Sequence, residues 1–200
     1  MRDPRKLIRP DFEHFPDELT KHDQWILYKL VKKKGKDKLA KVPYHPDNFT
    51  INAHSSANWM SFDDTCRAYE EFYPKFSGIG FVLAGRDNII GIDFDACMNG
   101  DGQPNPETLK EIYSINSYTE VSPSGEGTRV FAFGDIPVDG KEDKDAGVEI
   151  YKNGRFLTVT GNPLPGMPTD LEDSTGAILD LYNRYFGPKT DTEPDPTTSL

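Results

Sequence analysis

The sequence predicts one α/β (α+β) domain in which helices flank an antiparallel or mixed sheet. Short runs rich in β-branched and aromatic residues recur along the chain between Gly, Asn and Asp turns, which is typical of strands joined in hairpins. Apolar residues recur at helical spacing in residues 61–73, 106–115 and 174–186. With 200 residues, the chain is long enough to bury a core of its own.

The first expected elements are a hairpin and a helix. Residues 24–30 and 39–44 predict two antiparallel strands, and Lys41 falls near the end of the second strand. Ser61 is a candidate N-cap for the helix over residues 61–73, because its hydroxyl can accept a hydrogen bond from the first turn.

Two apolar runs come next, residues 78–84 and residues 89–95, joined by a Gly-Arg-Asp-Asn turn. A tight turn of this kind predicts a hairpin and not a βαβ crossover. The glycines in the first run therefore do not begin a dinucleotide-binding motif, since the third glycine and the following helix are both missing. No Walker-type phosphate loop occurs anywhere in the sequence.

Asp93 and Asp95 stand at alternate positions in the second apolar run, so they share one face of the expected strand. Two carboxylates held this close repel each other, and burial without a partner would cost several kcal/mol. A divalent metal ion would supply the positive charge that they need. A pair of exposed aspartates at a strand end is the alternative that this pattern alone leaves open.

Residues 122–129 read Ser-Pro-Ser-Gly-Glu-Gly-Thr-Arg between two further expected strands. Glycines let backbone amides converge on an anion, serine hydroxyls add donors, and a guanidinium suits phosphate. An ordinary glycine-rich hairpin turn is the alternative. As a triphosphate site, the segment offers Ser122, Ser124, Gly125, Gly127 and Arg129.

Glu149 lies in an alternating strand, residues 148–151, and a Lys-Asn-Gly turn leads to a strand that begins near Arg155. These strands predict a second hairpin. If it lies beside the aspartate strand, Glu149 becomes a third carboxylate for one metal cluster. A single Glu in a strand usually faces solvent, so this interpretation depends on the other motifs. The acidic segment 135–145 is expected to be a mobile loop.

The net charge of −10 argues against a generic nucleic-acid binder, whose DNA-contacting domain is usually basic. Seven lysines nevertheless fall within residues 29–41, and such a basic arm can hold phosphates on an acidic protein. A solvated hairpin tip explains the lysines equally well.

The composition also indicates the compartment. The two cysteines have no metal-type spacing and are interpreted as reduced packing residues. No membrane-spanning apolar stretch and no signal-peptide pattern occur, so a cytoplasmic protein without membrane contact is expected.

In combination, residues 93–95, 122–129, 148–151 and 154–161 resemble the primase-polymerase (Prim-Pol) domains of the archaeo-eukaryotic primase superfamily. The resemblance is greatest to the domains at the N-terminus of phage and plasmid replication proteins, and it covers roughly residues 23–161. Residues 148–151 and 154–161 form one motif, so the resemblance rests on three motifs. Three motifs in the family's order and spacing are more specific than any one of them.

The resemblance implies an RRM-like catalytic sheet and template-directed nucleotidyl transfer by a two-metal mechanism. Mg²⁺ or Mn²⁺ would be held by Asp93, Asp95 and Glu149. The phosphates of a dNTP or NTP would be held by the serine-glycine turn, Ser122, Ser124, Gly125, Gly127 and Arg129, with Arg155 and Lys41 as further contacts. The family commonly has histidine where this chain has Arg129, which keeps positive charge but removes a group that can titrate.

The resemblance also implies partners and a domain boundary. A single-stranded DNA template and a primer are the expected nucleic-acid partners. Residues 1–187 are expected to form the catalytic domain, and the Pro-, Thr- and Asp-rich residues 188–200 a linker to a C-terminal helicase or other replication module. Two other functions remain open, a non-catalytic nucleic-acid-binding module on the same fold and a metal-dependent phosphoesterase.

Overall fold

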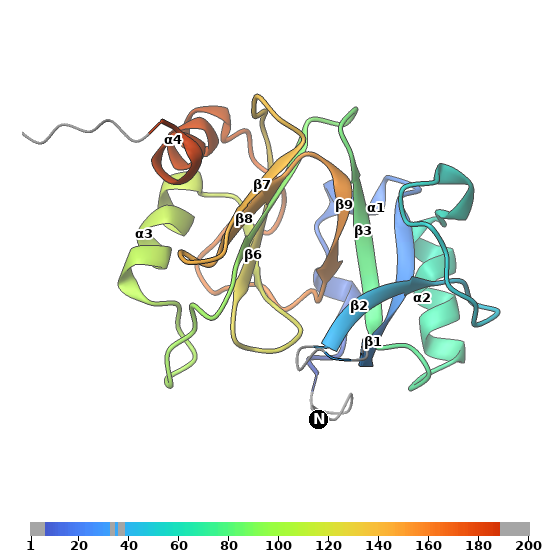
Figure 1. Cartoon of the computed structure of the whole chain (residues 1–200). Helices are drawn as coiled ribbons and strands as arrows, with labels where there is room; N and C mark the ends of the chain where they lie inside the picture. Colours follow the sequence, from blue (N-terminus) through green and yellow to red (C-terminus); the bar gives the residue numbers. More distant parts are fainter. Residues whose placement is uncertain (1–6, 33–34, 36–38, 189–200) are drawn as a thin grey trace, which may run out of the picture.

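The computed structural model describes residues 7–32, residue 35 and residues 39–188 (Figure 1). In this part of the chain the strands form two antiparallel sheets. The four-stranded sheet has the order β2 (Leu39–Tyr44), β1 (Trp25–Lys32), β3 (Gly78–Ala84) and β9 (Asn153–Val159). The five-stranded sheet has the order β5 (Tyr118–Val121), β6 (Thr128–Phe133), β4 (Ile89–Phe94), β8 (Val148–Tyr151) and β7 (Gly140–Asp143).

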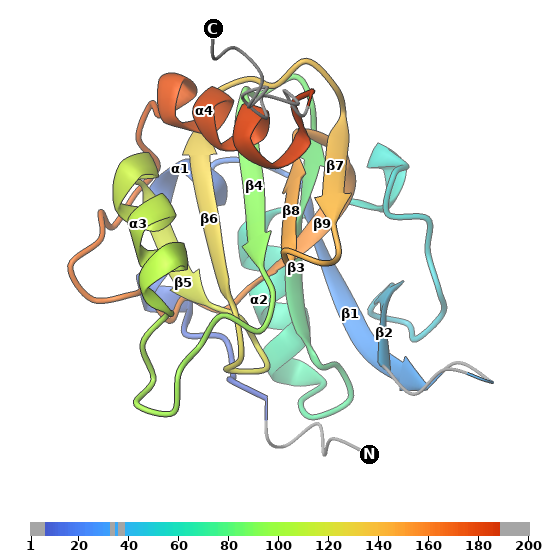
Figure 2. The same cartoon turned by 60° about the vertical axis from the view of Figure 1, so that its left-hand side comes forward.

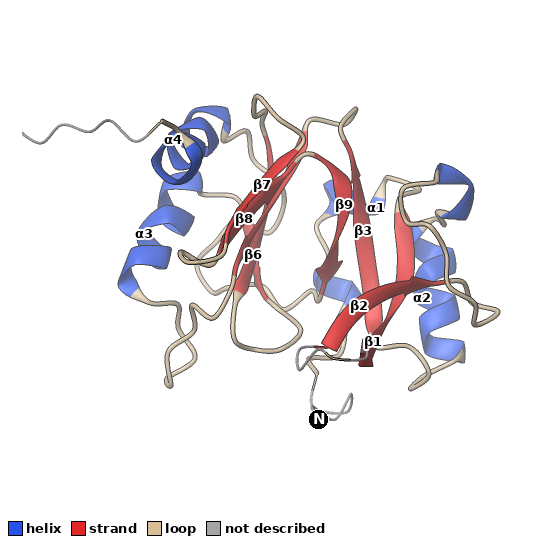
Figure 3. Ribbon diagram, in the orientation of Figure 1, coloured by secondary structure: helices blue, strands red, loops and turns tan. Residues whose placement is uncertain are grey.

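Helices cover the outer faces of both sheets (Figures 1 and 3). α2 (Phe62–Glu71) packs on the four-stranded sheet, and α3 (Pro106–Ile115) and α4 (Thr175–Phe186) lie over the five-stranded sheet (Figure 2). Shorter helical segments are α1 (Asp17–Thr20), η2 (Phe12–His14) and η3 (Ser56–Asn58). The observed architecture is therefore an α+β arrangement of antiparallel sheets and helices.

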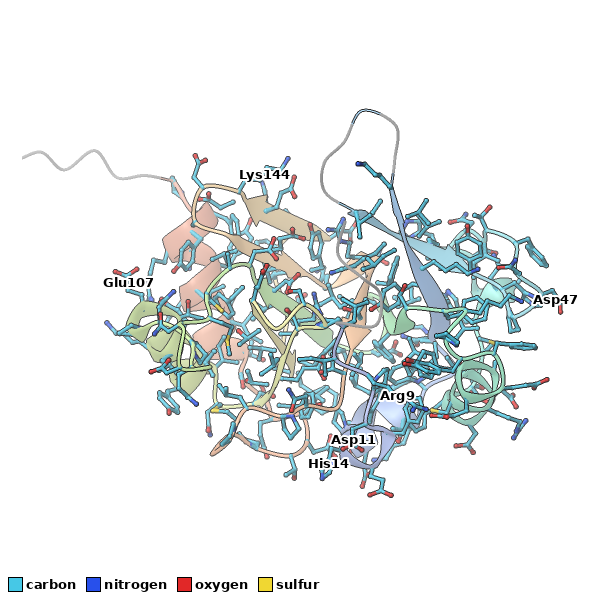
Figure 4. The ribbon with its side chains drawn as sticks, turned by 90° about the horizontal axis from the view of Figure 1, so that it is seen from below. Arg9, Asp11, His14, Asp47, Glu107 and Lys144 are labelled. Atoms are coloured by element: carbon cyan, nitrogen blue, oxygen red, sulfur yellow. The ribbon has the colours of Figure 1, made fainter. Side chains whose placement is uncertain are left out.

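Figure 4 shows the molecule from below. Glu107 of α3 and Asp47 of the loop after β2 stand at opposite ends of the molecule. The N-terminal segment contacts the end of β9 and α2, because Asp11 donates its backbone N–H to the Thr160 carbonyl at 2.8 Å and Arg9 pairs with Glu70 of α2 at 2.6 Å. This segment ties the α2 side of the molecule to the end of β9.

The sequence signals for the three longer helices are confirmed. Ser61 caps α2, since its hydroxyl accepts a hydrogen bond from the Asp64 N–H at 3.1 Å. α3 has Asn105 as its N-cap and Pro106 in its first turn, and it ends at Asn116 in the left-handed conformation.

The two faces of the five-stranded sheet have different roles. On the outer face Ile90, Ile92 and Phe94 of β4 pack in the core that α3 and α4 cover. On the inner face, Gly91 lies against the other sheet, where an added Cβ would be 2.4 Å from Leu157 Cδ1 and 3.0 Å from Leu83 Cδ1. The next inner-face residue of β4 is Asp93, so the candidate metal ligand faces the region between the sheets.

Both hairpins predicted around β4 and β9 are wrong. β3 pairs with β1 and β9, while β4 pairs with β6 and β8, so residues 85–88 join two different sheets. The turn that allows this has positive φ at Gly85 (74°) and Asn88 (54°). Likewise β8 and β9 lie in different sheets and do not form a hairpin. The close approach of Gly91 to Leu157 favours packing the two layers face to face over pairing them edge to edge.

The acidic segment 135–145, expected to be a mobile loop, contains the edge strand β7 (Gly140–Asp143). Most of the predicted lysine arm, at residues 33–34 and 36–38, lies outside the described residues, as do residues 189–200 of the predicted linker. Within the described ranges, no helix combines the length and apolarity that crossing a membrane requires.

Candidate active site

A row of charged side chains crosses the inner face of the five-stranded sheet. Asp93 on the central strand β4 is in register with Arg129 on β6 and with Glu149 on β8. The row continues outward, because Arg129 is opposite Glu120 of β5 and Glu149 is opposite Glu142 of β7. Directly opposed residues of antiparallel strands share a face, with Cβ atoms about 4.5–5.5 Å apart. The prediction that the Glu149 strand lies beside the aspartate strand is therefore confirmed.

Asp93 and Arg129 form a buried ion pair. Arg129 Nη2 lies 3.2 Å from Asp93 Oδ2, and the two residues are 2% and 6% exposed. Arg129 Nη1 also donates to the Thr158 carbonyl oxygen at 3.3 Å. Two buried atoms of this pair, Asp93 Oδ1 and Arg129 Nε, have no hydrogen-bond partner among the described residues. The carboxylate of Asp93 thus has one oxygen bound to arginine and one with unused acceptor capacity.

The electrostatic setting of Arg129 involves both of its neighbours on the row. Burial alone would lower the pKa of Arg129, but the negative charges of Asp93 and Glu120 outweigh that effect and raise it. The sequence motif had suggested Arg129 as a triphosphate ligand. In this structure its guanidinium binds Asp93 instead, and a contact with triphosphate stays a prediction.

Glu149 is paired as well. Its Oε2 accepts hydrogen bonds from Arg155 Nη2 at 2.8 Å and from the Tyr151 hydroxyl at 3.1 Å. Arg155 also lies over the Tyr151 ring, 4.9 Å from its centre. The predicted Glu149 and Arg155 therefore meet in space although they belong to different sheets.

Asp95 follows the end of β4, where its backbone N–H donates to the Gly147 carbonyl oxygen at 2.8 Å. In the residues that the structure describes, no three His, Cys, Asp or Glu side chains are grouped closely enough to hold a metal ion. Two ion pairs explain part of the separation between the acids, since Arg129 is paired with Asp93 and Arg155 is paired with Glu149. The metal cluster remains a prediction that requires these side chains to exchange partners.

A cavity of about 1330 Å³ opens over the row. Strands β1 and β2 form one wall of it, with Tyr28, Leu30 and Lys32 of β1 among the lining residues. The predicted site residues that line it come from both sheets and from the turn after β5: Lys41, Asp93, Asp95, Ser122, Ser124, Arg129, Glu149 and Arg155. Acidic, basic and hydroxyl groups therefore share one cavity with apolar side chains.

The serine-glycine turn is closed by its own hydrogen bonds. Gly125 donates its N–H to the Ser122 carbonyl at 2.8 Å, and Gly127 donates to the Ser122 hydroxyl at 3.2 Å. A Cβ on Gly127 would lie 2.4 Å from the Phe94 carbonyl oxygen, so glycine lets the turn approach the end of β4. In this structure Ser122 and Ser124 line the cavity, whereas the two glycine amides bond within the turn.

Lys41 of β2 faces the row from the opposite wall of the cavity. The Lys41 side chain is exposed to solvent at the cavity. Crowding by the protein around it and the positive charge of Arg129 lower the pKa of Lys41, although Asp93, Asp95 and Glu149 act in the other direction. The ammonium therefore lies within the electrostatic field of the three predicted metal ligands.

Glu120 and Glu142 are the charged residues of the row that the sequence motifs missed, and Glu120 is the buried one of the two. It is 0% exposed, and burial raises its pKa to about 7. The signal was in the hairpin register, because the turn 122–127 places residue 120 opposite residue 129 and so pairs an acid with an arginine. A charged pair on facing strands next to the serine-glycine turn is the pattern that could have identified Glu120.

No protein-family model matches the chain. A "DNA Primase-polymerase" from Nitratiruptor phage NrS-1 is 29% identical to this chain in an alignment of 184 residues, and the alignment covers 89% of this chain and 24% of that protein. The chain thus spans about a quarter of the length of this relative. The similarity supports a primase-polymerase relationship for nearly the whole chain.

Proposed function

We propose that the chain is a primase-polymerase domain that transfers nucleotides from (deoxy)nucleoside triphosphates to a template-paired 3′-hydroxyl. The observation that carries the proposal is the charged cavity between the two sheets, where acids suited to metal ions face groups suited to a triphosphate. The phage primase-polymerase that is 29% identical supports the same reaction class. The proposal includes an RRM-like primase fold for the five-stranded sheet and its helices.

Asp93, Asp95 and Glu149 are the residues proposed to hold Mg²⁺ or Mn²⁺. Carboxylate oxygens are the ligands that these cations prefer, and Asp93 Oδ1 is a buried acceptor without a partner in the described structure. Bound metal ions would lower the pKa of the attacking hydroxyl and neutralise charge on the leaving pyrophosphate.

The protein's own cationic and hydroxyl groups are proposed to bind the triphosphate. Lys41 and Arg155 supply charge from two walls of the cavity, and Ser122 and Ser124 add hydrogen-bond donors from the turn. Arg155 has to leave Glu149, to which it is bonded at 2.8 Å, in order to reach a phosphate. Nucleotide binding would therefore release Glu149 for the metal.

The substrates also define the partners. A single-stranded template and a primer would enter beside β1 and β2, where Lys32 begins the lysine-rich turn. We also propose that residues 188–200 link this domain to a helicase or other replication module, present in the same chain or supplied by another protein.

Template-dependent incorporation of a labelled deoxynucleotide with Mg²⁺ or Mn²⁺ tests this proposal. Asp93→Asn, Asp95→Asn and Glu149→Gln should each lower incorporation by about 100-fold or more, since each removes a proposed metal ligand. Glu107→Gln is the matched control, because Glu107 is an exposed acid on α3 far from the cavity (Figure 4).

The same assay separates the other functions. Absence of product from the wild-type chain with both metals, together with binding of the template, would indicate a non-catalytic nucleic-acid module. Release of nucleotides from DNA without added triphosphate would indicate a phosphoesterase.

A further inference from the structure

Glu120 is a fully buried carboxylate that the proposed reaction does not use. Its Oε2 accepts hydrogen bonds from the Gly161 N–H at 2.9 Å and the Tyr118 hydroxyl at 3.0 Å, and both of its oxygens lie 3.0 Å from the Thr160 N. Because burying a carboxylate is costly, these donors and a nearby cation are needed to keep it in place.

The nearby cation is Arg129, which stands between two acids. It is in register with Glu120 on one side and with Asp93 on the other. The ion pair joins Arg129 to Asp93, at 3.2 Å, while Glu120 acts on Arg129 through its charge. Across β5, β6 and β4 the charges therefore alternate as negative, positive and negative.

We propose that Glu120 is a positioning residue for the metal site: by sharing the charge of Arg129, it weakens the hold of Arg129 on Asp93 and lets a metal ion replace the guanidinium. The inference deepens the proposed function and rests on Asp93 being a metal ligand. Arg129 then acts as the counter-ion of Asp93 until a metal ion binds.

The charge of the buried Arg129 has to be balanced by a nearby carboxylate. With Glu120 ionised, the guanidinium keeps a buried counter-charge when Asp93 turns to a metal ion. Without Glu120, releasing Asp93 would leave Arg129 buried without an ionised partner on the row, which is strongly unfavourable. Removing Glu120 therefore makes Asp93 harder to release, and metal binding weakens.

Glu107 provides the charge-matched control. It is an exposed acid on α3, far from the cavity (Figure 4). Glu107→Gln removes the same formal charge from the protein as Glu120→Gln, at a place where solvent screens that charge.

The experiment is titration of the apo protein with Mn²⁺ in the absence of nucleotide, monitored by electron paramagnetic resonance. It is carried out at pH 8, above the pKa of about 7 to which burial raises Glu120. Glu120→Gln should weaken Mn²⁺ binding by about tenfold, within the range of coupling between residues of one charge network. Glu107→Gln should change it by less than about twofold, as expected for an exposed charge far from the cavity. Asp93→Asn should remove the site.

A double-mutant cycle shows whether Glu120 affects Mn²⁺ binding through Arg129. In an Arg129→Gln background, Glu120→Gln should have no further weakening effect, because Glu120 acts through Arg129. A purely structural role for Glu120 would lower the melting temperature and leave the Mn²⁺ affinity of the folded protein unchanged. Unchanged affinity, or the same loss in the Arg129→Gln background, overturns the inference.

Glu120→Asp keeps the test decisive if Glu120→Gln does not fold. The shorter side chain keeps its charge but draws the carboxylate away from Arg129, so an intermediate loss of about threefold is expected. Wild-type affinity in that variant contradicts the inference. If the wild-type protein binds no Mn²⁺, or Asp93→Asn binds it as well as wild type, the proposed metal site itself fails.

Discussion

Because Glu120 is buried, the free energy of unfolding is expected to depend on pH by a predictable amount. Its pKa is about 7 in the folded protein and is 4.5 for an unperturbed carboxyl. Below pH 4.5 the group is protonated in both states, so its contribution to stability is complete. Between pH 4.5 and pH 7 the unfolded chain loses the proton while the folded protein keeps it, which favours unfolding. A shift of this size corresponds to about 3 kcal/mol of stability lost over that interval.

Urea unfolding of wild type and Glu120→Gln, followed by circular dichroism from pH 4.5 to pH 8, measures this term. Other titrating groups are common to both proteins and cancel in the difference between their free energies of unfolding. Relative to the glutamine variant, wild type should lose stability as the pH rises to 7 and then level off. Parallel curves for the two proteins would refute the reasoning, and Glu142→Gln should run parallel to wild type because Glu142 is exposed.

Two further predictions concern packing and nucleotide binding. Gly91→Ala should lower the free energy of unfolding in urea by about 1–3 kcal/mol, because the new methyl group meets Leu157 and Leu83. The control Gly176→Ala, on the open surface of α4, should raise it by about 0.5 kcal/mol. Equal effects of the two substitutions would contradict the packing of the two sheets. Lys41→Ala should raise KM for the incoming dNTP about tenfold in steady-state incorporation, and Lys41→Arg should retain most of the affinity, since the charge facing the triphosphate is kept; an unchanged KM would remove Lys41 from the phosphate site.

The individual strands and helices could be predicted because their signals are local. Ser61 caps the helix that follows it, and the alternation around Asp93 and Glu149 gives the faces of their strands. The division into two sheets could not be predicted in this way. The Gly-Arg-Asp-Asn turn is compatible with a hairpin, and the outcome depends on the contact of Gly91 with Leu157, which lie far apart in the sequence.

The candidate site was predictable in its members and not in their contacts. The motifs identified the two carboxylates that face each other, Asp93 and Glu149, and the arginines near them. They did not show that Arg129 binds Asp93 or that Arg155 binds Glu149, because those pairings depend on the order of strands across the sheet and between the sheets. Glu120 was missed for a different reason, since a single glutamate in a strand usually faces solvent and nothing in its local sequence indicates that this one is buried.

A crystal structure with Mn²⁺ and a non-hydrolysable deoxynucleotide tests the central claim most directly. The account predicts Mn²⁺ bound to Asp93 together with Asp95 or Glu149, the triphosphate beside Ser122 and Lys41, and Arg129 withdrawn from the Asp93 oxygen that it contacts at 3.2 Å in this structure. A nucleotide bound outside the cavity, with the Arg129–Asp93 pair intact and no metal on Asp93, would contradict it.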